Sequence, residues 1–347
     1  MKNFNFAERL IVWQRRHGRH DLPWQGTRDA YRVWLSEIML QQTQVTTVIP
    51  YYRRFLECFP TVAALAGAQI SAVLELWAGL GYYARARNLH RCAQTIVAEH
   101  GGGFPATPQG LAELPGIGRS TAAAISVFAF GNRAAILDGN VKRVLARCFG
   151  IEGFPGEART EREMWTLAES LLPVAKVEAY TQGLMDLGAM LCTRRKPSCG
   201  RCPMLGNCVA QRDGRQHELP ASRPAKKLPE REAALILITD GERVLVERRP
   251  PTGIWGGLLV LPECPVDAAQ MFAQSLGCRV IKMNPLPALR HVFTHFRLDL
   301  KPLLCCVEMT EASVTDLGFE WLRLGDVAQA ALPTPVRKII TSLANKV

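Results

Sequence analysis

The sequence predicts two domains, a helical one over most of the chain and an α+β one at its C-terminal end. The length of 347 residues exceeds the usual size of a single domain. Helical apolar spacing recurs up to about residue 211, whereas alternating apolar residues typical of strands follow residue 230. Residues 212–230 hold three prolines and several basic side chains, which indicates a semi-extended linker. We therefore expect domains over 1–211 and 231–347.

The positive charge is concentrated in the first part of the chain. Residues 1–230 hold 29 Lys and Arg against 19 Asp and Glu, whereas residues 231–347 hold 13 against 12. A basic helical domain suits a polyanion, although a soluble basic surface gives the same count. The N-terminus has no apolar secretion signal, and no apolar run reaches transmembrane length. We expect a cytoplasmic protein that does not bind membranes.

Apolar periodicity locates the helices of the first domain. It predicts helices over 6–17, 29–43, 50–58, 70–77 and 84–99. Thr107 followed by Pro108 has the pattern of an N-cap and a first helical residue, so another helix is expected to begin there.

Glu37 lies in the second of these helices among Trp34, Ile38 and other apolar residues. Burial beside them would raise its pKa and make it a general acid near neutral pH. A solvated position at the edge of the apolar stripe is the commoner role of a lone glutamate. The polar residues 41–44 follow directly and can hydrogen-bond to bases or face water. Trp24, in the preceding loop, fits a core position when it is considered alone.

Residues 114–122 have the pattern of a helix-hairpin-helix. Pro115 and Gly116 end one helix, and Arg119 opens the next. Gly116 and Gly118 carry no side chain, so a phosphate backbone can approach the unpaired N–H groups at the start of the second helix. Such a hairpin grips a duplex without reading its bases, although a tight turn between two core helices fits the same residues.

Two other segments each allow two interpretations. Asp138 precedes a helix as an N-cap, and an N-cap close to a phosphate-binding hairpin also projects a carboxylate toward a bound strand. Residues 79–87 combine two glycines, two tyrosines and two arginines on a turn. This composition fits the insertion of an aromatic side chain into a base stack or a packed corner between helices.

Four of the eleven cysteines fall within 17 residues: Cys192, Cys199, Cys202 and Cys208. A protein kept in a reducing compartment holds such a cluster as metal ligands rather than as disulfides. Structural zinc sites usually pair two short C-x2-4-C units. Only one such pair is present, so the longer gaps favour a cluster larger than one ion. The basic residues 194–196 and 201 suggest that this loop also meets phosphate.

The residues after the linker alternate as strands do. Strands are expected over 233–239, 244–247, 256–261, 296–307 and 319–322, with helices near 267–276 and from 335 onward.

The hairpin, Asp138 beyond it and the cysteine loop over 192–208 together resemble the helix-hairpin-helix DNA glycosylases that carry an iron-sulfur cluster, the group that contains endonuclease III. Within that group, Trp24, residues 34–43 and residues 79–83 look like the MutY-type adenine DNA glycosylases. The last domain resembles Nudix hydrolases. The resemblance covers essentially the whole chain. It implies a mainly α glycosylase region with a 4Fe-4S loop, followed by an α+β Nudix-like domain.

The resemblance also implies roles for individual residues. Glu37 would protonate the adenine leaving group, and Asp138, positioned with help from Asn140, would stabilise the oxocarbenium-like sugar. Gln42 and Tyr82 would wedge into the duplex as adenine flips out. The remaining implied contacts are an adenine pocket at Trp24 and Gln182, DNA binding at Gly116, Gly118, Arg119 and Ser120, one 4Fe-4S cluster on the four cysteines, and 8-oxoguanine recognition by Phe293, Thr294 and His295.

Two departures from related patterns refine the expected activity. Endonuclease III-like enzymes that also cut the strand carry a catalytic lysine where this chain has Ser120, and a serine cannot form their Schiff base. We therefore expect little or no lyase activity. A Nudix helix needs several carboxylates to hold Mg²⁺, but residues 256–278 offer only Glu263 and Asp267. Nucleotide hydrolysis is not expected.

The sequence thus predicts a base excision repair enzyme that removes adenine mispaired with 8-oxoguanine or guanine in double-stranded DNA. We expect it to act as a monomer. The alternatives are an endonuclease III-like pyrimidine glycosylase, which Ser120 and the second domain disfavour, and a non-catalytic DNA-binding protein that holds an iron-sulfur cluster or zinc.

Overall fold

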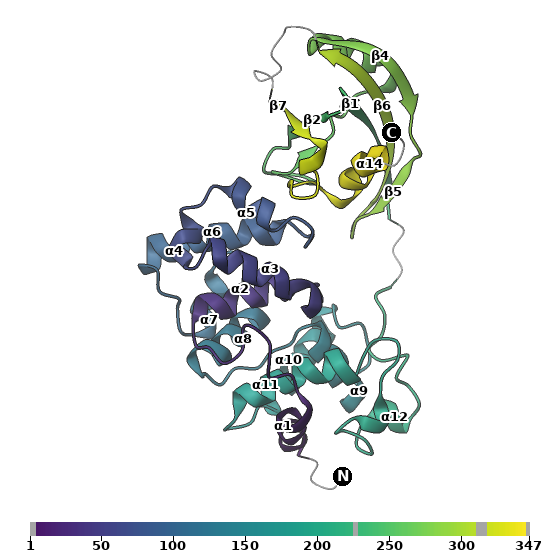
Figure 1. The fold of residues 1–347 in the computed structure, drawn as a ribbon. Coiled ribbons are helices and arrows are strands. Elements are labelled where there is room, and N and C mark those ends of the chain that lie inside the picture. Colours follow the sequence, from purple (N-terminus) through teal and green to yellow (C-terminus); the bar gives the residue numbers. More distant parts are fainter. Residues whose placement is uncertain (1–4, 225–227, 310–317, 345–347) are drawn as a thin grey trace. The chain divides into compact units, whose positions relative to one another are not determined.

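The computed structural model describes residues 5–224, 228–309 and 318–344 (Figure 1). Its internal contacts divide the chain into two units. The first unit comprises residues 1–67 and 88–225, and the second comprises residues 68–87 and 226–347. The segment 68–87 therefore belongs with the C-terminal part of the chain. The limits drawn from the sequence, at 211 and 231, stay a prediction.

Helices form nearly all of the regular structure before residue 213. They are α1 (Phe6–His17), α2 (Ala30–Leu40), α3 (Val45–Cys58), α4 (Val62–Ala66), α5 (Ile70–Leu76), α6 (Ala84–His100), α7 (Pro108–Glu113), α8 (Arg119–Phe130), α9 (Gly139–Phe149), α10 (Ala158–Ser170), α11 (Val177–Asp186) and α12 (Val209–Arg212).

The helix ends follow their capping residues. Thr107 is the N-cap of α7, and its hydroxyl accepts a hydrogen bond from the Gly110 N–H at 3.2 Å, as the sequence predicts. α2 ends at Leu40, three residues earlier than expected, and Gln42 beyond it has a φ of 57°. α3 begins at Val45 and carries Pro50 in its interior, so the expected start at residue 50 was wrong.

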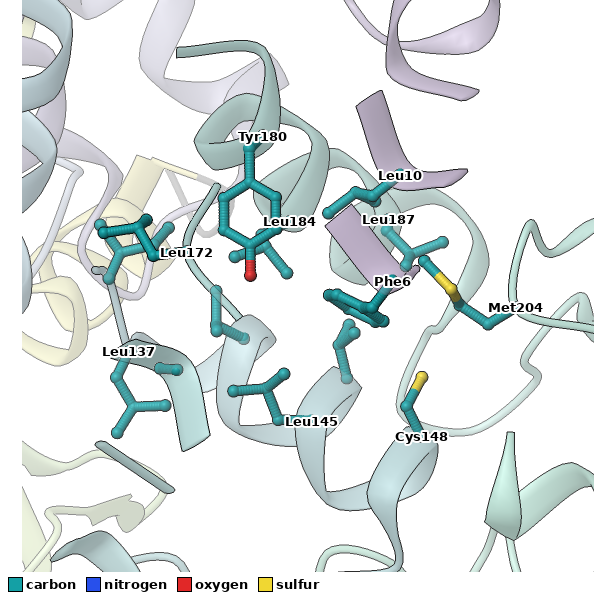
Figure 2. Close-up of a cluster of buried hydrophobic side chains, with 14 of the residues drawn as sticks. Phe6, Leu10, Leu137, Leu145, Cys148, Leu172, Tyr180, Leu184, Leu187 and Met204 are labelled. Atoms are coloured by element: carbon teal, nitrogen blue, oxygen red, sulfur yellow. The ribbon is translucent and has the colours of Figure 1, made fainter. Parts of the chain in front are cut away.

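One apolar core holds the end of the first unit together with its N-terminal helix. α1 contributes Phe6 and Leu10, which are at most 1% exposed. They pack with residues of α9 and α11, including Leu145 and Leu184, and Tyr180 points into the same cluster (Figure 2). This packing fixes α9 and α11 relative to each other, and these two helices carry several of the residues discussed below.

The linker does not leave the first unit immediately. Leu219 is 3% exposed, and its carbonyl accepts a hydrogen bond from Arg147 Nε at 2.8 Å. The basic composition of 212–230 suggested a semi-extended chain throughout, but an apolar side chain and a buried guanidinium hold its first half on the helical unit.

The second unit contains a mixed sheet. Its described strands are β1 (Glu230–Thr239), β2 (Arg243–Arg248), β3 (Leu259–Val260), β4 (Cys278–Pro285), β5 (Leu289–Val292), β6 (Arg297–Met309) and β7 (Phe319–Arg323). The order is β3-β2-β1-β6-β4, with β5 also paired to β6 and β7 to β2. β1 and β6 are parallel, and the other pairs are antiparallel.

Alternation along β1 buries both faces of the sheet. Leu235 and Leu237 pack with α14 (Thr334–Ala344) on one face. Ile236 and Ile238 pack with α13 (Ala269–Ser275) on the other face. The sequence did not predict β4 and β5, because β4 carries Lys, Asn and Pro among its apolar residues and β5 has only four residues. No helix in the described part of the chain is long and apolar enough to cross a membrane.

Candidate functional site

A pocket of about 460 Å³ opens in the first unit, a volume in the range of small-molecule sites. Residues from α1, α2, α11 and the loop over 19–28 line it. Trp24, Glu37 and Gln182, which come from three separate segments, all face this space. The structure therefore brings together the proposed acid and both residues predicted for an adenine pocket.

Two features of α2 position Glu37 in the pocket wall: the N-cap of the helix and its buried apolar face. Asp29 caps the helix by accepting a hydrogen bond from the Tyr31 N–H at 2.9 Å. The neighbouring Trp34, Leu35 and Ile38 are buried. Loss of hydration in this setting, and then repulsion by Asp138, raise the pKa of Glu37 to about 8. Glu37 therefore keeps its proton at neutral pH and can act as a general acid.

Asp138 is the N-cap of α9. Its Oδ1 accepts a hydrogen bond from the Val141 N–H at 2.7 Å. Burial raises the pKa of Asp138, while backbone N–H groups and the cations Arg143 and Lys142 act in the opposite direction. Asp138 therefore caps α9 and also interacts electrostatically with Glu37.

Asn140 lies in the first turn of α9, where Arg143 holds it. Arg143 Nη2 donates to Asn140 Oδ1 at 2.8 Å and to the Gly188 carbonyl at 2.8 Å. Gly188 allows this close approach, because a Cβ at that position would lie 2.6 Å from the Cβ of Asn140. Any other residue at position 188 would displace Asn140.

The predicted hairpin forms between α7 and α8. Gly116 has a φ of 79°, and a Cβ there would lie 2.7 Å from Asn88 Cβ, so only glycine fits. Gly118 precedes α8 with open space around its missing Cβ. Ser120 Oγ accepts a hydrogen bond from the Leu137 N–H at 2.9 Å, which ties the hairpin to the chain just before Asp138.

Arg119 already has partners within the first unit. Its guanidinium forms an ion pair with Glu169 at 2.6 Å and lies 3.8 Å from the centre of the Trp165 ring. Its side chain is still 59% exposed. Its predicted contact with DNA stays a prediction, and such a contact would compete with or add to this pairing.

Gln42 and Tyr82 share an unusual backbone conformation in separate units. Their φ angles are 57° and 48°, which lie in the left-handed region that residues other than glycine rarely adopt. Tyr82 is 52% exposed, and Arg85 lies 5.7 Å from the centre of its ring. A strained turn that presents an exposed aromatic ring is the geometry expected of a wedge residue.

The cysteine loop encloses a small cavity. Cys192, Cys199, Cys202 and Cys208 all line it, together with apolar residues of α9 and of the segment after α11. Among the described residues, no three His, Cys, Asp or Glu side chains converge closely enough to hold a single ion. Arg147 Nη1 donates to Cys192 Sγ at 3.4 Å and to the Thr193 carbonyl at 2.7 Å. The thiol of Cys148 on α9 lines the same space as the four thiols of the loop. The four loop thiols, with a cation donating to one sulfur, fit an anionic iron-sulfur group.

The β5–β6 turn of the second unit carries the residues predicted to recognise 8-oxoguanine. Phe293 is half-buried and stacks on Phe296, with ring centres 4.5 Å apart and an interplanar angle of 18°. Thr294 and His295 are exposed at the turn, and Thr294 Oγ1 lies 3.3 Å from His295 Nδ1. Phe293 therefore anchors the turn, and its two neighbours are available to a ligand.

Glu263, one of the two carboxylates in residues 256–278, already has a cationic partner. Glu263 Oε2 accepts a hydrogen bond from Arg249 Nη2 at 2.7 Å. The expected absence of nucleotide hydrolysis stays a prediction.

Sequence reasoning missed several residues in the pocket or next to it that form ion pairs. Arg28 and Glu178 line the pocket and pair with each other. Asp186 is fully buried and pairs with Arg19. An aspartate inside the apolar run 184–191 was a visible signal, because a buried carboxylate requires partners.

Comparisons with known proteins agree with this arrangement. Residues 35–170 match the HhH-GPD superfamily of base excision DNA repair proteins, residues 192–208 the iron-sulfur binding domain of endonuclease III, and residues 233–342 the NUDIX domain. The adenine DNA glycosylase of Buchnera aphidicola subsp. Acyrthosiphon pisum is 34% identical over 100% of both chains. The Homo sapiens adenine DNA glycosylase is 32% identical over 96% of this chain and 73% of its own.

Two solved structures share the helical fold. A thermostable thymine-DNA glycosylase is 31% identical with a TM-score of 0.55, and it covers 60% of this chain and 95% of its own. A non-covalent endonuclease III–DNA complex has a TM-score of 0.51 over the same shares at 21% identity, a likeness of fold alone.

Proposed function

This chain belongs to the adenine DNA glycosylase family, and we propose that it hydrolyses the N-glycosidic bond of adenine mispaired with 8-oxoguanine or guanine in double-stranded DNA. The observation that carries this proposal is the pocket in which Glu37, with its pKa raised to about 8, faces Trp24 and Gln182. A protonated carboxyl group in a pocket large enough for a purine supplies the acid that a poor leaving group needs.

The two carboxylates divide the work of the reaction. Glu37 gives its proton to the departing adenine, which would otherwise leave as an anion, and its carboxylate then takes a proton from the water that adds to the sugar. Asp138 faces the positive charge that develops on the sugar and stabilises it as a carboxylate. Burial raises the pKa of Asp138, and its hydrogen bonds from α9 and the cations Arg143 and Lys142 oppose that rise, which favours the charged form that this role requires. Asn140 is a positioning residue at the start of the same helix.

Adenine reaches the pocket after it leaves the base stack. The hairpin glycines and the N-terminus of α8 grip the phosphate backbone. Gln42 and Tyr82 occupy the space vacated in the duplex as the base flips out. The exposed Thr294 and His295 contact 8-oxoguanine on the opposite strand, and the protein acts as a monomer.

The four cysteines would hold one 4Fe-4S cluster. Bound there, the cluster supplies a structural centre that closes the loop over 192–208 and presents its basic residues to phosphate. With four thiolate ligands the cluster would have a structural role, and the residues of the pocket would carry the chemistry.

The test is a single-turnover assay on a labelled duplex with one adenine:8-oxoguanine pair, run with and without hot alkali. Release of adenine with strand breaks only after alkali supports a monofunctional glycosylase, as expected when Ser120 replaces the catalytic lysine. Glu37→Gln should lower the rate roughly 100- to 10,000-fold, the usual contribution of a general acid, while duplex binding stays within about twofold. The matched control is Glu57→Gln, which removes an exposed carboxylate on α3.

Each other result favours a different function. Breaks without alkali would indicate a bifunctional enzyme of the endonuclease III kind. Duplex binding without base release on any adenine mispair would leave a non-catalytic DNA-binding protein.

A further inference from the structure

We propose that Asp186 is a positioning residue that turns the carboxamide of Gln182 so that its oxygen faces the pocket, which selects a purine with an exocyclic amino group over one with a keto oxygen. The proposal rests on the function above, because it assumes that a flipped purine enters this pocket. It assigns a specificity role to a residue that does not itself line the pocket.

Asp186 is the last residue of α11, and its side chain has no exposure to solvent. Its Oδ1 accepts hydrogen bonds from Arg19 Nε at 2.7 Å and from Gln182 Nε2 at 2.9 Å. Its Oδ2 accepts a hydrogen bond from the Arg19 backbone N–H at 2.9 Å. The buried carboxylate is thus paired with one cation and bound by three N–H donors, as a buried charge requires.

The chemistry of the carboxylate fixes the orientation of the neighbouring amide. An ionised carboxylate only accepts hydrogen bonds, so Gln182 must present its NH₂ group and not its oxygen to Asp186. The orientation therefore follows from the partner. With Nε2 turned toward Asp186, Oε1 of Gln182 is left for the pocket that this residue lines.

An acceptor in the pocket discriminates between purines. Adenine carries an amino donor at its 6-position, whereas guanine and hypoxanthine carry a keto acceptor there. Gln182 Oε1 can accept a hydrogen bond from the amino group, but two acceptors facing each other repel and leave both unpaired. A site built to hydrogen-bond one group rejects the analogue that lacks it, because its own polar atom is then unpaired.

The same carboxylate also supports the loop that carries Trp24. The Arg19 carbonyl accepts a hydrogen bond from Gln25 Nε2 at 3.0 Å, and Gln25 Oε1 accepts one from the Leu22 N–H at 3.0 Å. Loss of Asp186 can therefore loosen the pocket wall as well as release Gln182. The experiment has to separate these two effects.

The measurement is the single-turnover rate of base release from two duplexes, with 2′-deoxyadenosine or 2′-deoxyinosine opposite 8-oxoguanine. For the full-length protein we expect adenine to leave much faster than hypoxanthine. Asp186→Asn should lower this adenine-to-hypoxanthine ratio roughly tenfold, the effect of one misplaced hydrogen-bonding group. Gln182→Met should lower the ratio by a similar factor. Asp213→Asn, which changes an exposed aspartate, should leave the ratio unchanged.

The double variant Asp186→Asn/Gln182→Met identifies the route of the effect. If Asp186 acts through Gln182, the double variant has the same ratio as Gln182→Met alone. Equal slowing of both substrates by Asp186→Asn, with an unchanged ratio, would reveal a merely structural role and overturn the proposal. If Asp186→Asn does not fold, an unchanged ratio for Gln182→Met overturns it as well.

The parent protein separates this inference from the function on which it rests. No adenine release by the parent would contradict the proposed function. Adenine release together with equally fast hypoxanthine release would contradict only the role assigned to Asp186 and Gln182.

Discussion

A carboxyl group that loses its hydration shell resists ionisation, and Glu37 is such a group. The buried Trp34 and Ile38 surround it on α2, and the carboxylate of Asp138 adds repulsion. The raised pKa is useful for acid chemistry but costs folding free energy at neutral pH, because the unfolded chain ionises freely where the folded chain does not.

This cost predicts a pH-dependent stabilisation by Glu37→Gln. The pKa of this carboxyl is 4.5 in its ordinary setting and about 8 in the fold. Between these values the folded state binds more protons than the unfolded state, so the parent loses stability as the pH rises from about 4.5 to 8. The variant does not titrate there. Its Tm should equal that of the parent near the lower value and exceed it by roughly 10 °C near the upper one, because this pKa difference corresponds to about 4 kcal/mol, at roughly 2–4 °C per kcal/mol.

Thermal melting across this pH range, followed by circular dichroism, measures the difference. Glu57→Gln, on the exposed side of α3, should show no pH-dependent gain. A constant offset between Glu37→Gln and the parent at every pH would contradict the assigned environment of Glu37.

Local pattern could predict the environment of Glu37, whereas its partner Asp138 was suggested only by the resemblance to a known family. The apolar neighbours of Glu37 are adjacent on one helix, so periodicity reveals them. Asp138 lies about a hundred residues away, and only the packing of α2, α8 and α9 brings it close. Sequence could not predict the hydrogen bonds between Asp186 and Arg19 either, since they join α11 to a loop near the N-terminus.

At the scale of elements, Arg147 holds the cysteine loop to α9. Its side chain is buried, at 3% exposure. It donates to the carbonyls of Leu219, Thr193 and Arg194 at 2.8, 2.7 and 3.0 Å. A planar fork of five donors can serve several carbonyls at once, whereas the single ammonium of lysine cannot. The linker and the loop therefore depend on one guanidinium.

Arg147→Lys should therefore weaken retention of the cluster. Each carbonyl left without a partner costs about 1–3 kcal/mol, and the loop that carries the four thiols is then free to open. We expect fewer iron atoms per chain and weaker visible absorbance than in the parent, measured on protein purified without oxygen. Arg195→Lys, at an exposed position in the same loop, is the matched control. Full iron content in Arg147→Lys would show that other contacts hold the loop.

Elements were predictable where local pattern decides them. The hairpin, α1 and the cap of α7 rest on glycines, apolar spacing and a threonine, and they form as expected. The start of α3 was missed because a proline usually lies in the first turn of a helix. In this structure α3 begins five residues before Pro50, and the buried Val48 and Tyr52 stabilise the helix on both sides of the proline. The strand β4 was missed because its pairing with β6, and not its own sequence, defines it.

At the scale of the whole molecule, the segment 68–87 joins the C-terminal part of the chain. Within this unit, Arg87 Nη1 donates to the Gly256 carbonyl at 2.7 Å, and Tyr83 OH donates to the Leu332 carbonyl at 3.2 Å. The same segment carries Tyr82, the proposed wedge. The domain proposed to recognise the lesion is thus hydrogen-bonded to the turn proposed to enter the duplex.

Truncation after residue 224 should therefore remove both the turn proposed to contact the lesion and the hydrogen-bond partners of the segment 68–87. It deletes the turn with Thr294 and His295, and it deletes the carbonyl partners of Tyr83 and Arg87. We expect the truncated protein to keep adenine release from both mispairs, because the pocket lies wholly in the first unit. Its preference for 8-oxoguanine over guanine should fall roughly tenfold, or about 1.4 kcal/mol. Unchanged discrimination would contradict the role assigned to residues 231–347.

Arg87→Met in the full-length protein separates the two contributions. It removes the hydrogen bond to Gly256 and leaves the lesion-facing turn intact, so a partial loss of preference would come from the wedge segment alone. The measurement is the ratio of single-turnover rates on adenine:8-oxoguanine and adenine:guanine duplexes. Arg91→Met, which removes an exposed bond to Asn88 on the same helix, is the control. A ratio for Arg87→Met equal to that of the parent would assign the whole preference to direct contact with the lesion.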